Sequence, residues 1–92
     1  MHVSAQVSLY PLGQGDLRPA IEAALRAFNV EDLEYQPGSM STLVTGDVAA
    51  VFAALRDAFD AAAEHGGTVM VATVSNACPP HRSRREGFAR DG

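Results

Sequence analysis

Residues 3–13 constrain the fold of this chain more than any other stretch. They read Val-Ser-Ala-Gln-Val-Ser-Leu-Tyr-Pro-Leu-Gly, with apolar and polar residues alternating as far as Tyr10. Successive side chains of a β-strand point to opposite faces, so the alternation predicts a strand with one apolar and one polar face. The polar face carries Gln6, Ser8 and Tyr10 and no charge. Hydroxyl, amide and aromatic groups suit a neutral heterocycle or a second sheet, which makes this face the first candidate for function.

A helix is predicted to follow this strand. Pro11 and two nearby glycines indicate a loop, because proline cannot donate to a β-ladder. Asp16 is expected to cap the helix and Asn29 to end it. Apolar residues at helical spacing form its predicted buried stripe: Leu17, Ile21, Ala24, Leu25 and Phe28.

The middle of the chain predicts a hairpin and a second helix. Strands are expected at 33–36 and 39–45, joined by Pro37-Gly38, and Gly46 is expected to end the second of them. Asp47 is the expected cap of the next helix. Its predicted apolar stripe consists of Val48, Val51, Phe52, Leu55, Phe59 and Ala62.

The last predicted strand, 68–75, follows Gly66-Gly67, which is expected to terminate the helix. Its sequence is nearly continuously apolar, which is typical of a strand buried on both faces. The chain order is therefore strand, helix, strand, strand, helix, strand. With right-handed crossovers, this order predicts an α+β, ferredoxin-like fold in which two helices cover one face of a four-stranded antiparallel sheet.

In that topology the first strand lies between the third and the last. The other face of the sheet stays open, and such faces on small domains are commonly closed by a partner subunit. We therefore expect a homodimer or tetramer. The folded domain is expected to span residues 1–79, and the arginine-rich residues 80–92 are expected to form a flexible tail.

Composition restricts the class of partner. Up to Cys78 the chain has three arginines and nine acidic residues, a net charge of −6, which does not suit a nucleic-acid backbone but is compatible with a cationic small molecule. No apolar run is long enough to cross a bilayer, and no leader sequence is visible. One cysteine among 92 residues fits a reducing compartment, so a cytoplasmic location is expected.

The residues that most often carry chemistry are scattered. The three histidines and Cys78 do not form a second pair of metal ligands, so no metal site is predicted. Neither a nucleophile with its base nor a carboxylate pair stands out. Residues 13–18, with two glycines and Arg18 before a helix, resemble the anion-binding loop of acylphosphatases, although Asp16 places a negative charge at its mouth. An acylphosphatase-like hydrolase is therefore kept as an alternative.

Polar side chains on several strands are expected to converge on one patch of the sheet. The alternative is that these residues only populate an exposed or subunit-facing sheet, since threonine is common in strands. The candidates for ligand binding are Gln6, Ser8, Tyr10, Ser41, Thr42 and Asn76.

Three short motifs occur in order: Ser8-Leu9-Tyr10-Pro11, Met40-Ser41-Thr42 before Gly46, and Cys78-Pro79 after the last strand. Together they resemble the YkoF family of thiamine- and hydroxymethylpyrimidine-binding domains, which is related to the MTH/YBL-type thiamine-binding proteins. The resemblance implies a non-catalytic, ferredoxin-like domain that binds thiamine or its pyrimidine moiety in thiamine salvage, transport or sensing. It implies no cofactor, and it implies that copies of a single-domain chain associate. A structural or regulatory oligomerisation module without a small ligand is the remaining alternative.

Overall fold

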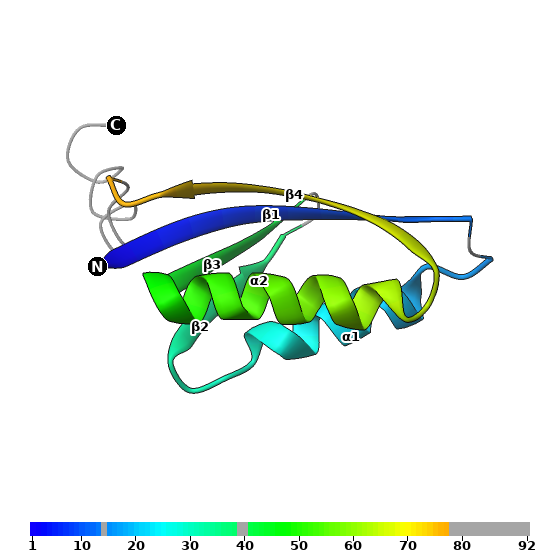
Figure 1. Ribbon diagram of the computed structural model, residues 1–92, viewed down its shortest axis with the longest axis horizontal. Helices are drawn as coiled ribbons and strands as arrows, with labels where there is room; N and C mark the ends of the chain where they lie inside the picture. The colour runs from blue at the N-terminus through cyan, green and yellow to red at the C-terminus, as the bar shows by residue number, and fades with distance from the viewer. Residues whose placement is uncertain (14, 39–40, 78–92) are drawn as a thin grey trace.

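Figure 1 shows six elements that follow one another in the predicted order. The computed structural model describes residues 1–13, 15–38 and 41–77. The elements are β1 (His2–Leu12), α1 (Arg18–Phe28), β2 (Leu33–Pro37), β3 (Thr42–Asp47), α2 (Val48–Ala63) and β4 (Gly67–Ser75). The predicted domain boundary at residue 79, the tail 80–92 and the Cys78-Pro79 motif lie outside the described residues.

The four strands form one antiparallel sheet in the order β2-β3-β1-β4, and both helices pack against the same face. This arrangement confirms the ferredoxin-like fold and the central position of β1. The helix α1 contacts β1 and β2, and the helix α2 contacts β1, β3 and β4.

The alternation of β1 divides its residues between the two faces as predicted. Val3, Ala5 and Val7 are buried and belong to the core, where they meet the helices. The prediction that Pro11 ends the strand is wrong, because β1 continues to Leu12 and Pro11 lies opposite Thr68 of β4. At this point β1 has already passed the end of β3, whose pairing stops at Val7, so the missing N–H of Pro11 interrupts no ladder on that side.

The helix α1 begins at Arg18, two residues after the predicted cap. Leu17 holds the cap position and makes no side-chain capping bond, while the Asp16 carboxylate accepts the backbone N–H of Arg18 at 3.1 Å. The predicted stop at Asn29 is confirmed. The helix buries small alanines and Phe28, whereas the predicted stripe residue Leu17 is exposed.

The prediction that Gly46 ends β3 is wrong, because the strand continues to Asp47. Position 46 requires a glycine because β3 approaches the start of β2 closely at this point. A Cβ atom at this position would lie 2.6 Å from Leu33 Cδ2 and 2.9 Å from the carbonyl oxygen of Asp32. The strand begins at Thr42, and residues 39–40 of the predicted strand lie outside the described residues.

Asp47 caps α2 as predicted, and its carboxylate accepts the backbone N–H of Ala49 at 3.1 Å. Three of the six residues of the predicted stripe, Val51, Leu55 and Ala62, are buried, and Val48 is half-buried. Phe52 and Phe59 are the exception, since both rings are exposed. Each follows a buried residue by one position and is therefore turned about 100° away from the core.

The expectation that the last strand is buried on both faces is wrong. β4 is an edge strand that pairs only with β1 in the described part of the chain, and Val69 and Val71 are exposed. A continuously apolar sequence is compatible with a strand covered on both faces and with a strand that leaves one face exposed. The sequence pattern alone therefore did not distinguish a buried strand from an exposed edge strand.

Candidate functional site

Three of the predicted site residues lie on the open face of the sheet. Gln6, Ser8 and Tyr10 alternate with the buried residues of β1 and point away from the helices. Ser41, just before β3, joins them, because the Gln6 side-chain amide donates a hydrogen bond from Nε2 to Ser41 Oγ at 3.2 Å. The structure thus brings together residues from β1 and from the β2–β3 connection.

Thr42 lies on the opposite face of the sheet. It is paired with Val7, and residues paired across antiparallel strands share a face. Val7 is buried against the helices, so Thr42 belongs to the helix side, next to the Ser41 that reaches toward Gln6. Ser41 and Thr42, although consecutive, therefore face opposite sides of the sheet: Ser41 contacts Gln6 on the open face, and Thr42 lies on the helix side.

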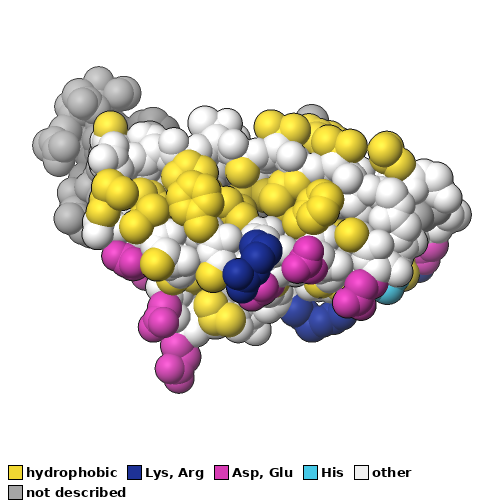
Figure 2. Space-filling view, in the orientation of Figure 1, with side chains coloured by type: hydrophobic (Ala, Val, Ile, Leu, Met, Phe, Trp, Pro, Cys, Tyr) yellow, Lys and Arg dark blue, Asp and Glu magenta, His cyan; other side chains and the backbone are white. Residues whose placement is uncertain are grey.

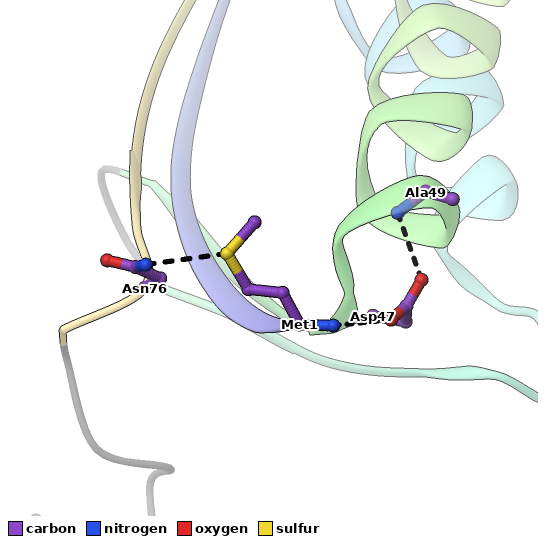
Figure 3. A network of polar contacts seen from close by, with 4 residues as sticks. All are labelled: Met1, Asp47, Ala49 and Asn76. Atoms are coloured by element: carbon purple, nitrogen blue, oxygen red, sulfur yellow. Dashed lines mark hydrogen bonds and ion pairs between the residues drawn. The ribbon is translucent and has the colours of Figure 1, made fainter.

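Asn76 lies far from Tyr10. Tyr10 is paired with Val69, whereas Asn76 follows Ser75, about 20 Å further along β4 at about 3.3 Å per residue. Figure 3 shows the surroundings of Asn76, whose Nδ2 lies 3.4 Å from the Met1 sulfur. The structure does not bring Asn76 together with the other predicted site residues.

A cleft opens between the sheet and α1, on the helix side. Its volume is about 160 Å³. Hydrophobic side chains form most of its wall, Gly38 and Ser41 come from the β2–β3 connection, and Thr42 is the first residue of β3. The lining residues are Val7, Leu9, Ile21, Ala24, Leu25, Phe28, Gly38, Ser41, Thr42 and Met70.

The apolar walls of this cleft were not predicted as site residues. Ile21, Leu25 and Phe28 were expected to be core, because a stripe at helical spacing normally packs against a sheet. Ile21 and Leu25 are in fact only half-buried. Ala24 of α1 lines the cleft beside them, and Met70 of β4 also lines it.

A second hollow, of about 260 Å³, lies on the open face between β2 and β3. It is lined by Glu34, Tyr35, Gln36, Leu43 and Thr45. It is the more polar of the two, and none of the six predicted site residues lines it. The cleft beside α1 is therefore the better candidate, because it contains two of the predicted residues in an apolar surround.

In the loop that resembles an anion-binding site, Arg18 is paired with Asp16 of the same loop. The Arg18 guanidinium donates to both carboxylate oxygens of Asp16, at 3.3 and 3.2 Å. These bonds, and then the backbone N–H of Arg18, lower the pKa of the Asp16 carboxyl below its ordinary value. Arg18 is thus paired with an acid on its own loop, and the arrangement does not favour an incoming anion.

Within residues 1–13, 15–38 and 41–77, no three histidine, cysteine or acidic residues gather as a metal site would require. None of the helices in this part of the chain is both long enough and apolar enough to cross a membrane.

The sequence model of the YKOF-related family matches residues 2–81 of the chain. A comparison with curated proteins finds no significant match. Solved structures match over nearly the whole chain. The protein MJ1052 from Methanocaldococcus jannascii superposes with a TM-score of 0.80 at 23% identity, and the match covers 96% of this chain and 94% of that one.

Two further structures are similar. A DUF77 domain from Bacillus cereus gives a TM-score of 0.80 at 14% identity, covering 99% of this chain and 92% of the other. The protein TM0486 from Thermotoga maritima, described as a candidate thiamine biosynthesis/salvage protein, gives a TM-score of 0.79 at 13% identity, covering 96% and 99%. At these identities the structural matches establish the fold alone.

Proposed function

The chain belongs to the YKOF-related family, and from this membership we propose that it binds thiamine or its hydroxymethylpyrimidine moiety without catalysis. Its role would lie in thiamine salvage, transport or sensing, with no cofactor. The description of TM0486 as a candidate thiamine biosynthesis/salvage protein supports this choice of ligand. The observation that carries the proposal is the cleft between the sheet and α1.

The size of the cleft suits one six-membered ring. An apolar protein cavity of about 150 Å³ binds benzene, and this cleft measures about 160 Å³. Whole drug-sized ligands occupy pockets of roughly 300 Å³ or more. The pyrimidine ring would therefore enter the cleft, and the rest of a thiamine molecule would remain outside it.

The polar groups of the cleft suit an aminopyrimidine. This ring presents nitrogen acceptors and an amino donor, and a hydroxyl group can both donate and accept. Because the Ser41 oxygen accepts a hydrogen bond from Gln6, its own O–H remains able to donate to a ring nitrogen. Thr42 offers a second hydroxyl from the neighbouring position.

The charge of the domain suits the thiazolium part of thiamine. Residues 1–77 carry nine acidic residues against three arginines, a net charge of −6. Figure 2 shows acidic side chains along one margin of the molecule. An acidic surface attracts a cation at long range, although this contributes to encounter more than to ring recognition.

The six candidate residues then have different proposed roles. Ser41 and Thr42 would contact the ring, and Gln6 would orient Ser41. Ser8, Tyr10 and Asn76 do not line the cleft, and Ser8 and Tyr10 lie on the other face of the sheet, so no contact with the bound ligand is proposed for these three residues. Given the single cysteine, the cytoplasm is the proposed compartment.

Isothermal titration calorimetry with thiamine and with hydroxymethylpyrimidine tests the proposal. Both ligands are expected to bind, and Thr42→Val is expected to weaken binding by about 2- to 13-fold, the value of one neutral hydrogen bond. Thr73→Val, on the exposed part of β4 away from the cleft, is the matched control and should leave binding unchanged. Absence of both heat and a thermal shift at millimolar ligand would contradict the proposal and favour an oligomerisation module without a small ligand.

Self-association is the second part of the proposal. A chain of 92 residues has a limited core, and association buries further apolar surface. We propose a homodimer or tetramer, as the family resemblance implies for a single-domain chain.

A further inference from the structure

The two edges of the sheet differ in how well they are protected against pairing with another strand. β2 has five residues and carries Glu34 and Pro37. A short strand, a charge and a proline are all devices by which proteins discourage edge-to-edge pairing. β4 has nine residues, reading Gly-Thr-Val-Met-Val-Ala-Thr-Val-Ser, with neither a charge nor a proline. An edge strand of that kind is a template for another strand.

The side chains at the β4 edge are apolar and exposed. Val69 and Val71 retain 44% and 53% of their accessible surface on the open face of the sheet. Both pair with β1 on one side only in the part of the chain that the structure describes. An isolated valine on a surface needs no explanation, but two on the free edge of a long uncharged strand form a continuous surface.

The flank of α2 continues this surface. Phe52 and Phe59 lie seven residues, or about two turns, apart on the same side of the helix and are 52% and 40% exposed. α2 is the helix that contacts β4, in addition to β1 and β3, whereas the main strand contacts of α1 are with β1 and β2. Figure 2 shows hydrophobic side chains gathered over α2 and along β4 on one face of the molecule.

We propose that a second copy of this chain docks on the surface formed by the β4 edge, Phe52 and Phe59. The two β4 strands would pair antiparallel across a two-fold axis, giving one continuous eight-stranded sheet. The two α2 helices would then pack against each other beneath it through their phenylalanines. The inference rests on the self-association proposed above and gives it a surface; it does not depend on which small molecule binds.

Two-fold symmetry is the reason for choosing an identical partner. An antiparallel pair is formed by two strands related by a two-fold axis, so a free edge is complementary to its own copy. The strand brings no charge to the contact. Arg56, on the turn between the two rings, already donates to Asp57 of the same helix at 3.2 Å, so a two-fold contact does not confront two uncompensated cations.

The available area reaches what a specific dimer needs. A strand of nine residues presents an edge about 30 Å long and about 10 Å thick, or roughly 300 Å². Two half-exposed phenylalanines add about the area of one aromatic side chain, roughly 150–250 Å². The two copies together would bury roughly 900–1,100 Å², close to the 1,000 Å² expected of a biological interface. The strand or the helix flank alone would fall short of it.

Multi-angle light scattering of the intact chain across a micromolar concentration series tests the inference. The wild-type chain is expected to show twice its monomer mass of 9.7 kDa. The double substitution Phe52→Glu/Phe59→Glu is expected to shift it to monomer, because both rings are exposed in the single chain and their loss need not disturb the core. Val30→Glu, at an exposed apolar residue outside this surface, is the matched control and should remain dimeric.

A second variant separates edge pairing from stacking of the open sheet faces. Leu43→Lys places a charge on the open face, on β3 and away from β4. If the copies pair through β4, this variant remains a dimer. If Leu43→Lys dissociates the dimer while Phe52→Glu/Phe59→Glu does not, self-association stands but this surface is wrong. A wild-type monomer at all concentrations overturns both the surface and the proposed self-association.

Hydrogen exchange gives an independent readout. In the dimer, the β4 amides that point away from β1 are expected to be protected by the partner strand. In Phe52→Glu/Phe59→Glu they should exchange rapidly while β1 and β3 amides stay protected. Equal exchange of these β4 amides in wild type and variant, at concentrations where the wild type is dimeric, would overturn the edge-pairing geometry.

Discussion

Gln6 and Ser41 are 35 positions apart in the chain, yet the Gln6 amide donates to the Ser41 hydroxyl oxygen at 3.2 Å. The bond links the exposed face of β1 to the connection that borders the cleft on the other face. Ser41 therefore contacts Gln6 on the polar face of the sheet and also lines the apolar cleft.

The link between these residues predicts coupled effects on ligand binding. Ser41→Ala is expected to weaken binding of hydroxymethylpyrimidine by roughly 2- to 13-fold, and Gln6→Leu by a smaller factor, because it removes only the partner that orients the hydroxyl. Since Gln6 acts through Ser41, adding Gln6→Leu to Ser41→Ala should cause little further loss. Calorimetry of the four proteins measures this, and fully additive losses would show that Gln6 contacts the ligand itself.

Filling the cleft is predicted to abolish binding without unfolding the protein. Leu25 is half-buried and lines the cleft, so Leu25→Trp would place an indole ring in the space proposed for the pyrimidine. The thermal midpoint Tm should change little, because the added side chain enters an opening and not a packed interior. Leu12→Trp, at an exposed position of β1 that does not line the cleft, is the control. Unimpaired binding by Leu25→Trp would place the ligand elsewhere.

Gly46→Ala is predicted to destabilise the fold. The new Cβ would meet the Asp32 carbonyl oxygen at 2.9 Å as well as the Leu33 side chain, and the carbonyl belongs to the backbone and cannot turn aside. Overpacking of this kind costs about 1–3 kcal/mol, and each kcal/mol lowers Tm by roughly 4–8 °C in a domain of this size. Gly15→Ala, where an added Cβ has no heavy atom within 4 Å, should leave Tm nearly unchanged. Equal Tm values for the two variants would contradict the close approach of β3 and β2.

Acid sensitivity is predicted at the start of α2. Hydrogen bonds from the Met1 ammonium group, and then from the Ala49 N–H, lower the pKa of the Asp47 carboxyl (Figure 3). A carboxyl whose pKa is lower in the folded state contributes its full stability above the unfolded value, about 3.9, and loses it as the pH falls through the folded value. Stability should therefore decline below about pH 4.

Asp47→Asn isolates this contribution. Asparagine is also a good helix cap, so the variant should keep α2 while losing the charge that titrates. Thermal unfolding followed between pH 7 and pH 3 should show a shallower decline below pH 4 for Asp47→Asn than for wild type. An identical pH profile in the two proteins would assign the acid sensitivity to other carboxyl groups.

The sheet and its inner face could be predicted because the signals are local. The alternation of Val3, Ala5 and Val7 with polar residues is a property of consecutive positions, and these three residues are buried as it predicts, although Ser4 on the other face is buried too. The cap at Asp47 likewise depends on an N–H only two residues away. The prediction that Pro11 ends the first strand failed because the cost of a missing N–H depends on whether a partner strand lies opposite it. The position of β3 relative to Pro11 is a property of the whole sheet and not of the local sequence.

The cleft could not be predicted, because its walls come from β1, α1, the β2–β3 connection, β3 and β4. Ile21 and Leu25 have the spacing of ordinary core residues, and only the packing of α1 against the sheet leaves them half-buried beside a space. Thr42 and Asn76 were grouped with Gln6 by residue type. Strand pairing separates them, since it turns Thr42 to the helix side and leaves Asn76 at the far end of β4.

The sequence by itself determined the type and order of the six elements, the buried face of β1 and the cap of α2, because each depends on periodicity or on contacts within a few residues. Only the tertiary structure decided which apolar residues are covered. Val71 and Phe52 are as hydrophobic as the residues beside them, but β4 came to lie at the edge of the sheet and α2 beneath it, so these side chains face outward. Whether a side chain is buried depends on which distant segments of the chain pack against it. Residues 3–13 therefore specify a strand by themselves, but the order of the strands in the sheet places Ser41 within hydrogen-bonding distance of Gln6.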